Sequence, residues 1–160
     1  MRTAASRGTA VHKMCEDYLN NQHIKWPNEF DKHKTKNFLA WSMFVQMRDI
    51  LGNVDNIRCL ESSLYSDELK LAGQVDCIAE YKGKLSIIDF KTSTKEKKEE
   101  WIENYYIQTC AYAQMFEERT GQEVNQLVIL IVTQDGTVQE FVKDKKEYLP
   151  LLDSCLLYTS

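Results

Sequence analysis

The chain has 160 residues, of which 43% are hydrophobic and 11% aromatic, so it can bury a core and is not a disordered polar segment. Its formal net charge of −4 argues against a large nonspecific polyanion-binding surface. Nucleic acid is not excluded as a ligand, because carboxylates that bind a cation contribute negative charge that the cation offsets. We expect a single domain over residues 1–160.

Cysteine usage indicates a reducing compartment. The cysteines are odd in number, widely spaced and without a CxxC pair, which is typical of free thiols; they are Cys15, Cys59, Cys77, Cys110 and Cys155. The chain has no apolar run long enough for a membrane span and no apolar segment of a secretory signal. We predict the cytoplasm of a bacterial or phage-infected cell, or mitochondria if a targeting segment is missing. The tail over residues 143–160 is interpreted as truncated or foreign.

The first half of the chain predicts two helices and a strand. Apolar residues at i, i+3, i+4, i+7 and i+8 indicate an amphipathic helix over Thr9–Leu19, with Thr9 as its N-cap. A polar connector follows, and its basic run over residues 32–36 is interpreted as a solvated surface. A second helix is predicted over Thr35–Leu51, and a strand over Ile57–Tyr65.

The second half predicts most of a sheet. A hairpin over Leu71–Ser93 precedes a long helix over Glu99–Thr120. The apolar run within Asn125–Thr133 is typical of a central strand, and a short strand over Thr137–Val142 and a helix over Lys143–Leu157 follow. This order predicts an α/β fold with a mixed sheet of about five strands flanked by helices.

Carboxylates in the predicted hairpin are its most informative feature. A turn centred on Lys82-Gly83 places Asp76 opposite Asp89, and alternation places Lys91 on the same face as Asp89. Two carboxylates about 5 Å apart repel by roughly 3 kcal/mol at an effective dielectric of about 20. A divalent cation held between them would turn this repulsion into attraction. A structural Asp–Lys ion pair in a sheet explains the spacing equally well.

The roles of three other polar residues depend on where the fold places them. His12, one turn before Glu16, is by itself a partly exposed surface histidine. Glu61 matters only if it lies on the carboxylate face of the sheet. Gln108 lies in an aromatic row of its helix, where a buried amide needs a hydrogen-bond partner.

Four sequence blocks resemble the PD-(D/E)XK nuclease superfamily, and within it the RecB-like exonuclease branch, which includes mitochondrial and phage exonucleases. No P-loop, GxGxxG, GxSxG or HExxH motif competes with this interpretation. The blocks are RGTAVH at residues 7–12 with Glu16, GQVD at 73–76, IDFKT at 88–92, and YYIQ at 105–108 followed by AYA at 111–113.

The resemblance covers roughly residues 7–142, implies a restriction-endonuclease-like core there, and gives roles to individual residues. The implied metal ligands are His12, Asp76, Asp89 and, more loosely, Glu61. Lys91 resembles the water-activating lysine, and Gln108 with Tyr105 resembles a helical motif that supports the site. The implied catalytic set is thus Asp76, Asp89, Lys91 and Gln108. The implied substrate-binding residues are Arg7, Thr9, Thr92, Tyr105 and Tyr112. As a ligand, His12 would need an acceptor for its second ring nitrogen, which Glu16 could provide.

These features predict a Mg²⁺- or Mn²⁺-dependent deoxyribonuclease that acts as an exonuclease on single-stranded ends in DNA repair or recombination. One alternative is a structure-selective or restriction-like endonuclease, and another is a non-catalytic nucleic-acid-binding domain that keeps the fold. The cysteine cluster that binds iron–sulfur in some relatives is absent. We expect no accessory domain of the kind fused to many relatives within residues 1–160, and therefore a helicase or single-strand-binding protein as a partner.

Overall fold

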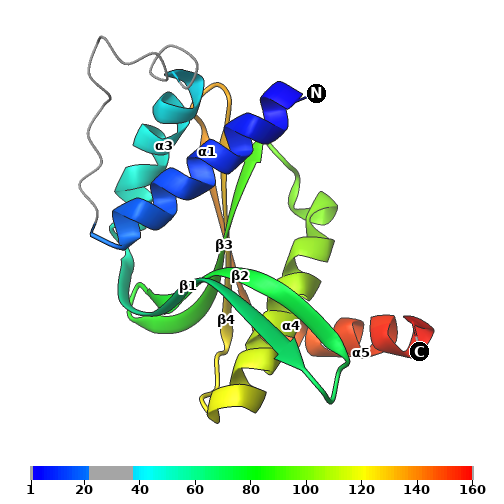
Figure 1. The fold of residues 1–160 in the computed structure, drawn as a ribbon. Helices are drawn as coiled ribbons and strands as arrows, with labels where there is room; N and C mark the ends of the chain where they lie inside the picture. Colours follow the sequence, from blue (N-terminus) through cyan, green and yellow to red (C-terminus); the bar gives the residue numbers. More distant parts are fainter. Residues whose placement is uncertain (1, 22–37, 160) are drawn as a thin grey trace.

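A computed structural model describes the backbone of residues 2–21 and 38–159 and the side chains of residues 6–21 and 38–156 (Figure 1). The helices are α1 (Arg2–Leu19), α3 (Phe38–Leu51), α4 (Glu103–Thr120) and α5 (Leu149–Thr159), with 3₁₀ turns η1 (Glu99–Trp101) and η2 (Lys145–Glu147). The strands are β1 (Val54–Ser66), β2 (Leu71–Tyr81), β3 (Lys84–Ser93), β4 (Gln126–Thr133) and β5 (Val138–Asp144). The basic run over residues 32–36 lies outside the described residues.

The five strands form one mixed sheet in the order β1-β2-β3-β4-β5. Only β3 and β4 pair in parallel, and the connection between them contains α4, as a parallel crossover requires. The other neighbours are antiparallel. The α/β fold with a mixed five-stranded sheet is therefore confirmed.

Helices α1 and α3 cover one face of the sheet. Alternate residues of the central strands point to them, including Ile88 and Phe90 of β3 and Val128 and Leu130 of β4. Each fully buried side chain of this size contributes about 1.5–3 kcal/mol of hydrophobic free energy. Figure 1 shows α1 lying across this face of β3. This packing fixes the helix that carries His12.

Helices α4 and α5 cover the opposite face. Ile78 of β2, Ile87 of β3 and Leu127 of β4 pack with buried residues of α4, among them Met115 and Phe116. Because side chains alternate along a strand, Asp89 lies on the same side of β3 as Ile87. Asp89 thus faces α4, the helix that carries Tyr105 and Gln108.

The β2–β3 turn confirms the register predicted from Lys82-Gly83. Both residues have positive φ, 52° and 84°, as a two-residue type I′ turn requires. Tyr81 pairs with Lys84, and the ladder continues in that register. A Cβ on Gly83 would meet nothing, so this glycine serves the backbone conformation alone.

Several element boundaries differ from the prediction. Helix α1 begins at Arg2, so Thr9 is an exposed residue inside the helix and the predicted N-cap is wrong. The glycine before it marks close packing instead, because a Cβ on Gly8 would lie 3.0 Å from Thr92 Oγ1. The two later helices each open with a separate 3₁₀ turn, η1 and η2, rather than as one continuous helix.

Candidate metal centre

The site lies where β2 and β3 separate. Their ladder ends at the pair Cys77–Ile88, and in the same register the next backbone groups of β3, those of Phe90, would face Val75. Instead, the Phe90 N–H donates to Asp76 Oδ2 at 2.8 Å. Figure 1 shows the β1–β2 pair turning away from β3. The side chain of Asp76 therefore takes the place of a backbone partner. We call this point, where β2 and β3 separate beyond the pair Cys77–Ile88, the fork.

His12 uses the other free backbone group of the same residue. Its Nε2 lies 2.5 Å from the Phe90 carbonyl oxygen, which can only accept, so Nε2 is the donor. In a neutral ring Nδ1 then carries the lone pair, and it lies 3.6 Å from Asp76 Oδ1 and 3.7 Å from Glu61 Oε1. The acceptor that a ligand histidine needs is thus a backbone carbonyl. Glu16 instead lies 3.9 Å from Lys13 on the same helix.

Glu61 reaches the fork through an unusual backbone conformation. It sits in β1 with φ of 44°, a left-handed value that costs a non-glycine residue about 1–2 kcal/mol. Its neighbours in β1 pair with Cys77 and Val75, so this twist lies directly beside Asp76. Glu61 Oε1 is buried and accepts no hydrogen bond. Strained residues with unsatisfied oxygens are typical of functional sites.

Together these side chains form a ligand cluster. One ligand atom each from His12, Glu61 and Asp76 lies within 4.8 Å of the others. Carboxylate oxygens suit Mg²⁺ and Mn²⁺, and imidazole is compatible with Mn²⁺ and later transition metals. A cation would also satisfy the buried Glu61 oxygen that has no partner. The residues present therefore fit a divalent metal ion.

Asp89 and Lys91 complete the site on the α4 side. Lys91 Nζ lies 3.0 Å from Asp89 Oδ2 and 4.6 Å above the centre of the Tyr105 ring. The ion pair and the cation–π contact hold the ammonium on the carboxylate side of the sheet. The structure thus brings together Asp76, Asp89 and Lys91, as the hairpin register predicted.

The carboxylates influence one another's protonation. Burial, together with the neighbouring Asp89, raises the pKa of Asp76 to about 9. Burial also raises the pKa of Glu61, and the nearby His12 opposes that shift. For Lys91, burial lowers the pKa, but Asp89 and Asp76 outweigh it and the net pKa is raised. This is the repulsive arrangement of carboxylates that folding alone does not favour.

The helical part of the site differs from the sequence interpretation. Gln108 is exposed rather than buried, and its Nε2 donates to the Tyr112 hydroxyl at 3.1 Å. Tyr112 itself is buried, and burial with the charges of Asp89 and Asp76 raises its pKa. A Cβ on Gly73 would lie 2.8 Å from the Tyr112 ring, so the glycine of the GQVD block makes room for this tyrosine.

Sequence reasoning missed the part played by the backbone. Neither the Phe90 N–H nor its carbonyl could be assigned before the end of the ladder was known. The close contact between Gly73 and Tyr112 was also missed, although a glycine inside a strand is the usual signal for such an approach. Of the predicted substrate-binding residues, Arg7 and Thr92 line one small hollow beside the fork.

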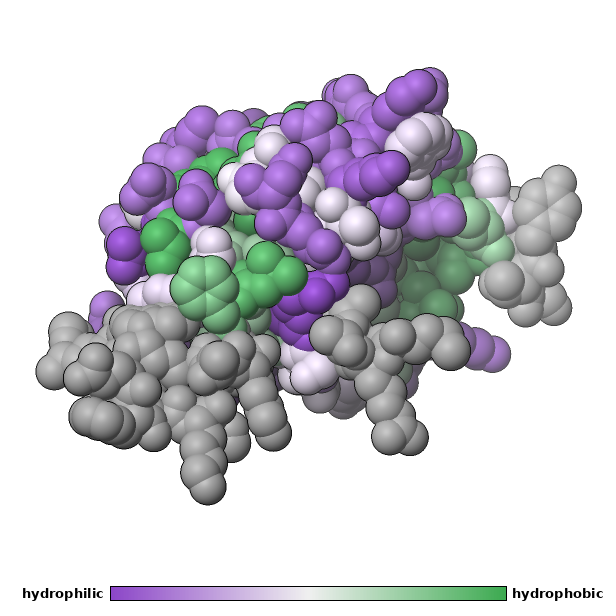
Figure 2. All heavy atoms as spheres, turned by 90° about the horizontal axis from the view of Figure 1, so that it is seen from above, coloured by the Kyte–Doolittle hydropathy of each residue, from purple (hydrophilic) through white to green (hydrophobic). Residues whose placement is uncertain are grey.

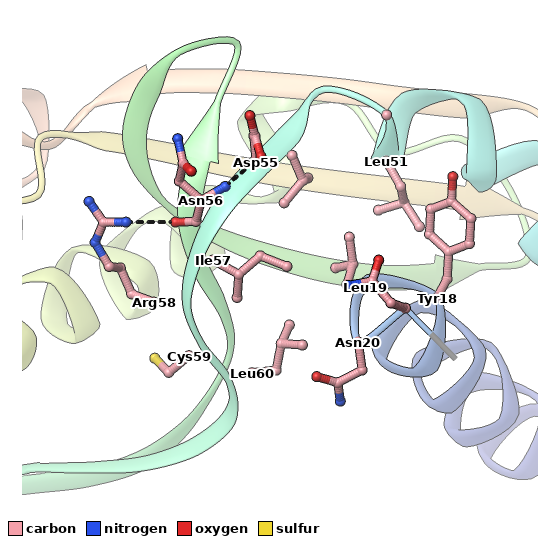
Figure 3. A pocket seen from close by; sticks show the side chains of 13 residues that line it. Tyr18, Leu19, Asn20, Leu51, Asp55, Asn56, Ile57, Arg58, Cys59 and Leu60 are labelled. Atoms are coloured by element: carbon pink, nitrogen blue, oxygen red, sulfur yellow. Dashed lines mark hydrogen bonds between the residues drawn. The ribbon is translucent and has the colours of Figure 1, made fainter. Parts of the chain in front are cut away.

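A roomier hollow lies elsewhere. It has a volume of about 900 Å³ and lies between the ends of α1 and α3 and the irregular start of β1, where Leu19, Leu51 and Ile57 line it (Figure 3). Arg58 and Asp55 are occupied there by hydrogen bonds to the backbone of Asn56. The side chains of His12, Glu61 and Asp76 do not line this hollow, so the volume of a hollow does not identify the metal centre.

Comparison with known proteins gives the family. The chain matches the PD-(D/E)XK nuclease superfamily over residues 1–155, and it belongs to that superfamily. Nucleases of this superfamily use divalent metal ions. Among the described residues, no helix is long and apolar enough to cross a membrane.

Individual relatives are exonucleases by name. The chain is 31% identical over 136 residues to human mitochondrial genome maintenance exonuclease 1, covering 82% of this chain and 37% of that protein. The same exonuclease of Xenopus tropicalis is 33% identical over 138 residues, with the same two coverages. The chain thus spans little more than a third of these relatives. A crystal structure of a candidate exonuclease from Eubacterium rectale superimposes with a TM-score of 0.61 at 13% identity, covering 96% of this chain and 63% of that chain, which supports the fold.

Proposed function

We propose that this chain is a metal-dependent deoxyribonuclease domain that hydrolyses phosphodiester bonds from single-stranded ends. The observation that carries the proposal is the cluster of His12, Glu61 and Asp76 within 4.8 Å, with the Asp89–Lys91 pair beside it. The names of the relatives support exonuclease action. We treat residues 1–160 as one nuclease-like domain, with Mg²⁺ or Mn²⁺ as the ion.

The carboxylates and His12 hold the ion in this proposal. Asp76, Asp89 and Glu61 offer oxygen ligands, and Nδ1 of His12 offers a nitrogen. When bound, a divalent ion polarises a phosphoryl oxygen and lowers the pKa of water. The hydrogen bonds of Phe90 to His12 and Asp76 keep both side chains oriented before substrate arrives.

Lys91 has a separate role beside the ion. Its ammonium is fixed by Asp89 and the Tyr105 ring, so its remaining N–H groups can donate to the attacking water and to a phosphoryl oxygen. Fixed donors of this kind stabilise the negative charge that develops in the transition state. Asp89 therefore both contributes a ligand and positions Lys91.

Helix α4 supports this arrangement from the face of the sheet on which Asp89 and Lys91 lie. Gln108 holds the Tyr112 hydroxyl, and Tyr105 lies under Lys91. Tyr105, which is half-buried beside Lys91, offers a ring on which a base of a single strand can stack, as the sequence blocks implied, whereas Tyr112 is buried against Gly73 and can support the site only from within. Thr9, exposed on α1, and Thr92 are assigned to the substrate strand in the same way.

A cleavage assay tests the proposal. Linear single-stranded DNA, labelled at one end, is incubated with Mg²⁺ or Mn²⁺ and wild-type protein, and we expect Asp89→Ala and Lys91→Ala to lose about 10²–10⁴-fold of the activity. Lys84→Ala is the matched control, because it removes an exposed lysine from the turn end of the same strand.

The substrates separate the competing functions. An exonuclease leaves circular single-stranded DNA intact, whereas an endonuclease cuts it. Blocking the 5′ or the 3′ end then gives the polarity, and RNA of the same sequence tests the preference for DNA. Equal activity in wild type, Asp89→Ala and Lys91→Ala would contradict the assignment of this site.

A further inference from the structure

A small polar hollow lies at the carboxyl end of β3. It has a volume of about 130 Å³, and its lining residues come from four separate segments: Arg7, Met43, Thr92, Ser93, Thr94 and Gln134. Helix α1 can approach the strand here because Gly8 has no side chain, and a Cβ at that position would lie 3.0 Å from Thr92 Oγ1. The end of the molecule where β3 and β4 finish is mainly hydrophilic in Figure 2.

The hollow is lined by hydrogen-bond donors without protein partners. Within the described part of the chain, the Arg7 guanidinium, the Thr92 and Thr94 hydroxyls and the Gln134 side-chain amide make no hydrogen bond or ion pair. Arg7 is half-buried, and a guanidinium has five N–H donors and no acceptor. No acidic side chain lines the hollow in the described residues. Such a set of donors is complementary to an anion with several oxygens.

The walls of the hollow are held in place by other contacts. The Gln134 N–H donates to the Ser93 carbonyl at 3.1 Å, which joins the segments that follow β3 and β4. The Ser93 hydroxyl donates to the Lys95 carbonyl at 2.5 Å, so it is used within the loop. The backbone of Lys97 exchanges two hydrogen bonds with the Gln139 side chain, at 2.8 and 2.9 Å. The donors therefore project from a pre-organised frame.

The position relative to the metal centre suggests the ligand. Thr92 follows Asp89 by three strand residues, or about 10 Å, and Arg7 precedes His12 by five helix residues, or about 7.5 Å. Both steps lead from the metal centre to the hollow. An extended single strand rises more per nucleotide than the about 3.4 Å of a duplex, so this separation corresponds to about one or two nucleotides. An arginine guanidinium can donate to two phosphate oxygens at once, and hydroxyl groups add further hydrogen bonds to the phosphate.

We propose that Arg7, with the Thr92 and Thr94 hydroxyls and the Gln134 amide, binds one phosphate group of the substrate strand about one or two nucleotides from the cleaved bond. This inference rests on the proposed nuclease function and deepens it. The same chemistry suits an internal phosphodiester or a terminal phosphate. Binding there would fix how far the strand extends past the metal centre before it is cut.

The test measures binding without cleavage. A 3′-fluorescein-labelled oligothymidylate is titrated in EDTA, at several salt concentrations, with wild type, Arg7→Gln and Thr94→Val. We expect Arg7→Gln to weaken binding about 10- to 100-fold, because it removes charge-assisted hydrogen bonds. We also expect it to lower the slope of log K against log salt by about 0.7, the value for one phosphate contact on a single strand. Thr94→Val should weaken binding less and leave the slope unchanged.

Arg48→Gln is the matched control, because it removes an exposed arginine near the end of α3 and should change neither affinity nor slope. A loss seen only with a 5′-phosphorylated strand indicates a terminal phosphate, and an equal loss without it indicates an internal one. If Arg7→Gln behaves like Arg48→Gln, the phosphate site is wrong even when wild type cleaves DNA. If the Arg7 effect is found but wild type with Mn²⁺ cleaves nothing, the phosphate site stands and the nuclease proposal fails.

Discussion

The two halves of the β2–β3 hairpin are built from the same strands but differ in strand pairing and in the polarity of their side chains. Near the turn, from Cys77–Ile88 to Tyr81–Lys84, every position is paired and the buried side chains are apolar except for Ser86. Beyond Cys77 the strands separate, and carboxylates occupy the space between them. The paired half supplies stability, and the separated half exposes backbone groups that orient ligands. The candidate metal ligands therefore gather where the regular pairing of β2 and β3 ends.

Backbone conformation shows the same division. Positive φ at the turn falls on Lys82 and Gly83, where the hairpin requires it. At the fork it falls on Glu61, where no turn is made and the strand runs on. The positive φ values at the turn thus allow the hairpin to form, whereas the positive φ of Glu61 sets the position of a carboxylate.

The largest expected effect on stability belongs to the paired half. Ile87→Ala removes a fully buried side chain of β3 that packs with buried residues of α4, and it should lower the free energy of unfolding by about 2–5 kcal/mol. Urea unfolding followed by circular dichroism measures this loss. Lys84→Ala, at an exposed site of the same strand, should change it by less than about 0.5 kcal/mol. A small loss for Ile87→Ala would mean that this half is not the stable part of the hairpin.

A smaller effect of opposite sign is expected at the fork. Glu61→Gly relieves a left-handed backbone and a buried carboxylate without a partner, and it should raise the free energy of unfolding by about 1 kcal/mol in EDTA. The same variant should bind Mn²⁺ more weakly than wild type. Ser62→Gly, one residue further along β1, should instead be destabilising. Equal destabilisation by Glu61→Gly and Ser62→Gly would show that the backbone of Glu61 is not strained.

Local sequence signals were sufficient for the hairpin and the sheet. The Lys82-Gly83 turn fixed the register, and the register placed Asp76, Asp89 and Lys91 at one site. Apolar periodicity located the strands and helices, because burial on one or both faces of a sheet dictates that pattern. The sequence blocks indicated the superfamily that the family comparison shows.

Tertiary approach could not be predicted in the same way. Gly8 was interpreted as a signal for the start of a helix, but it permits contact between α1 and Thr92. Gln108 is expected to be buried because its neighbours are aromatic, yet it is exposed and its amide donates to the Tyr112 hydroxyl. The acceptor for His12 is a backbone group 78 residues away, which no spacing rule identifies.

Metal binding by the fork is the central claim, and calorimetric titration with Mn²⁺ tests it most directly. Wild type should bind the ion, and Asp76→Asn should weaken binding by at least about 10- to 100-fold, since it replaces a carboxylate of the cluster. Glu80→Gln is the matched control, because it makes the same change in the paired half of the same strand and should bind like wild type. Absence of binding by wild type, or equal binding by all three proteins, would contradict a metal centre at the fork.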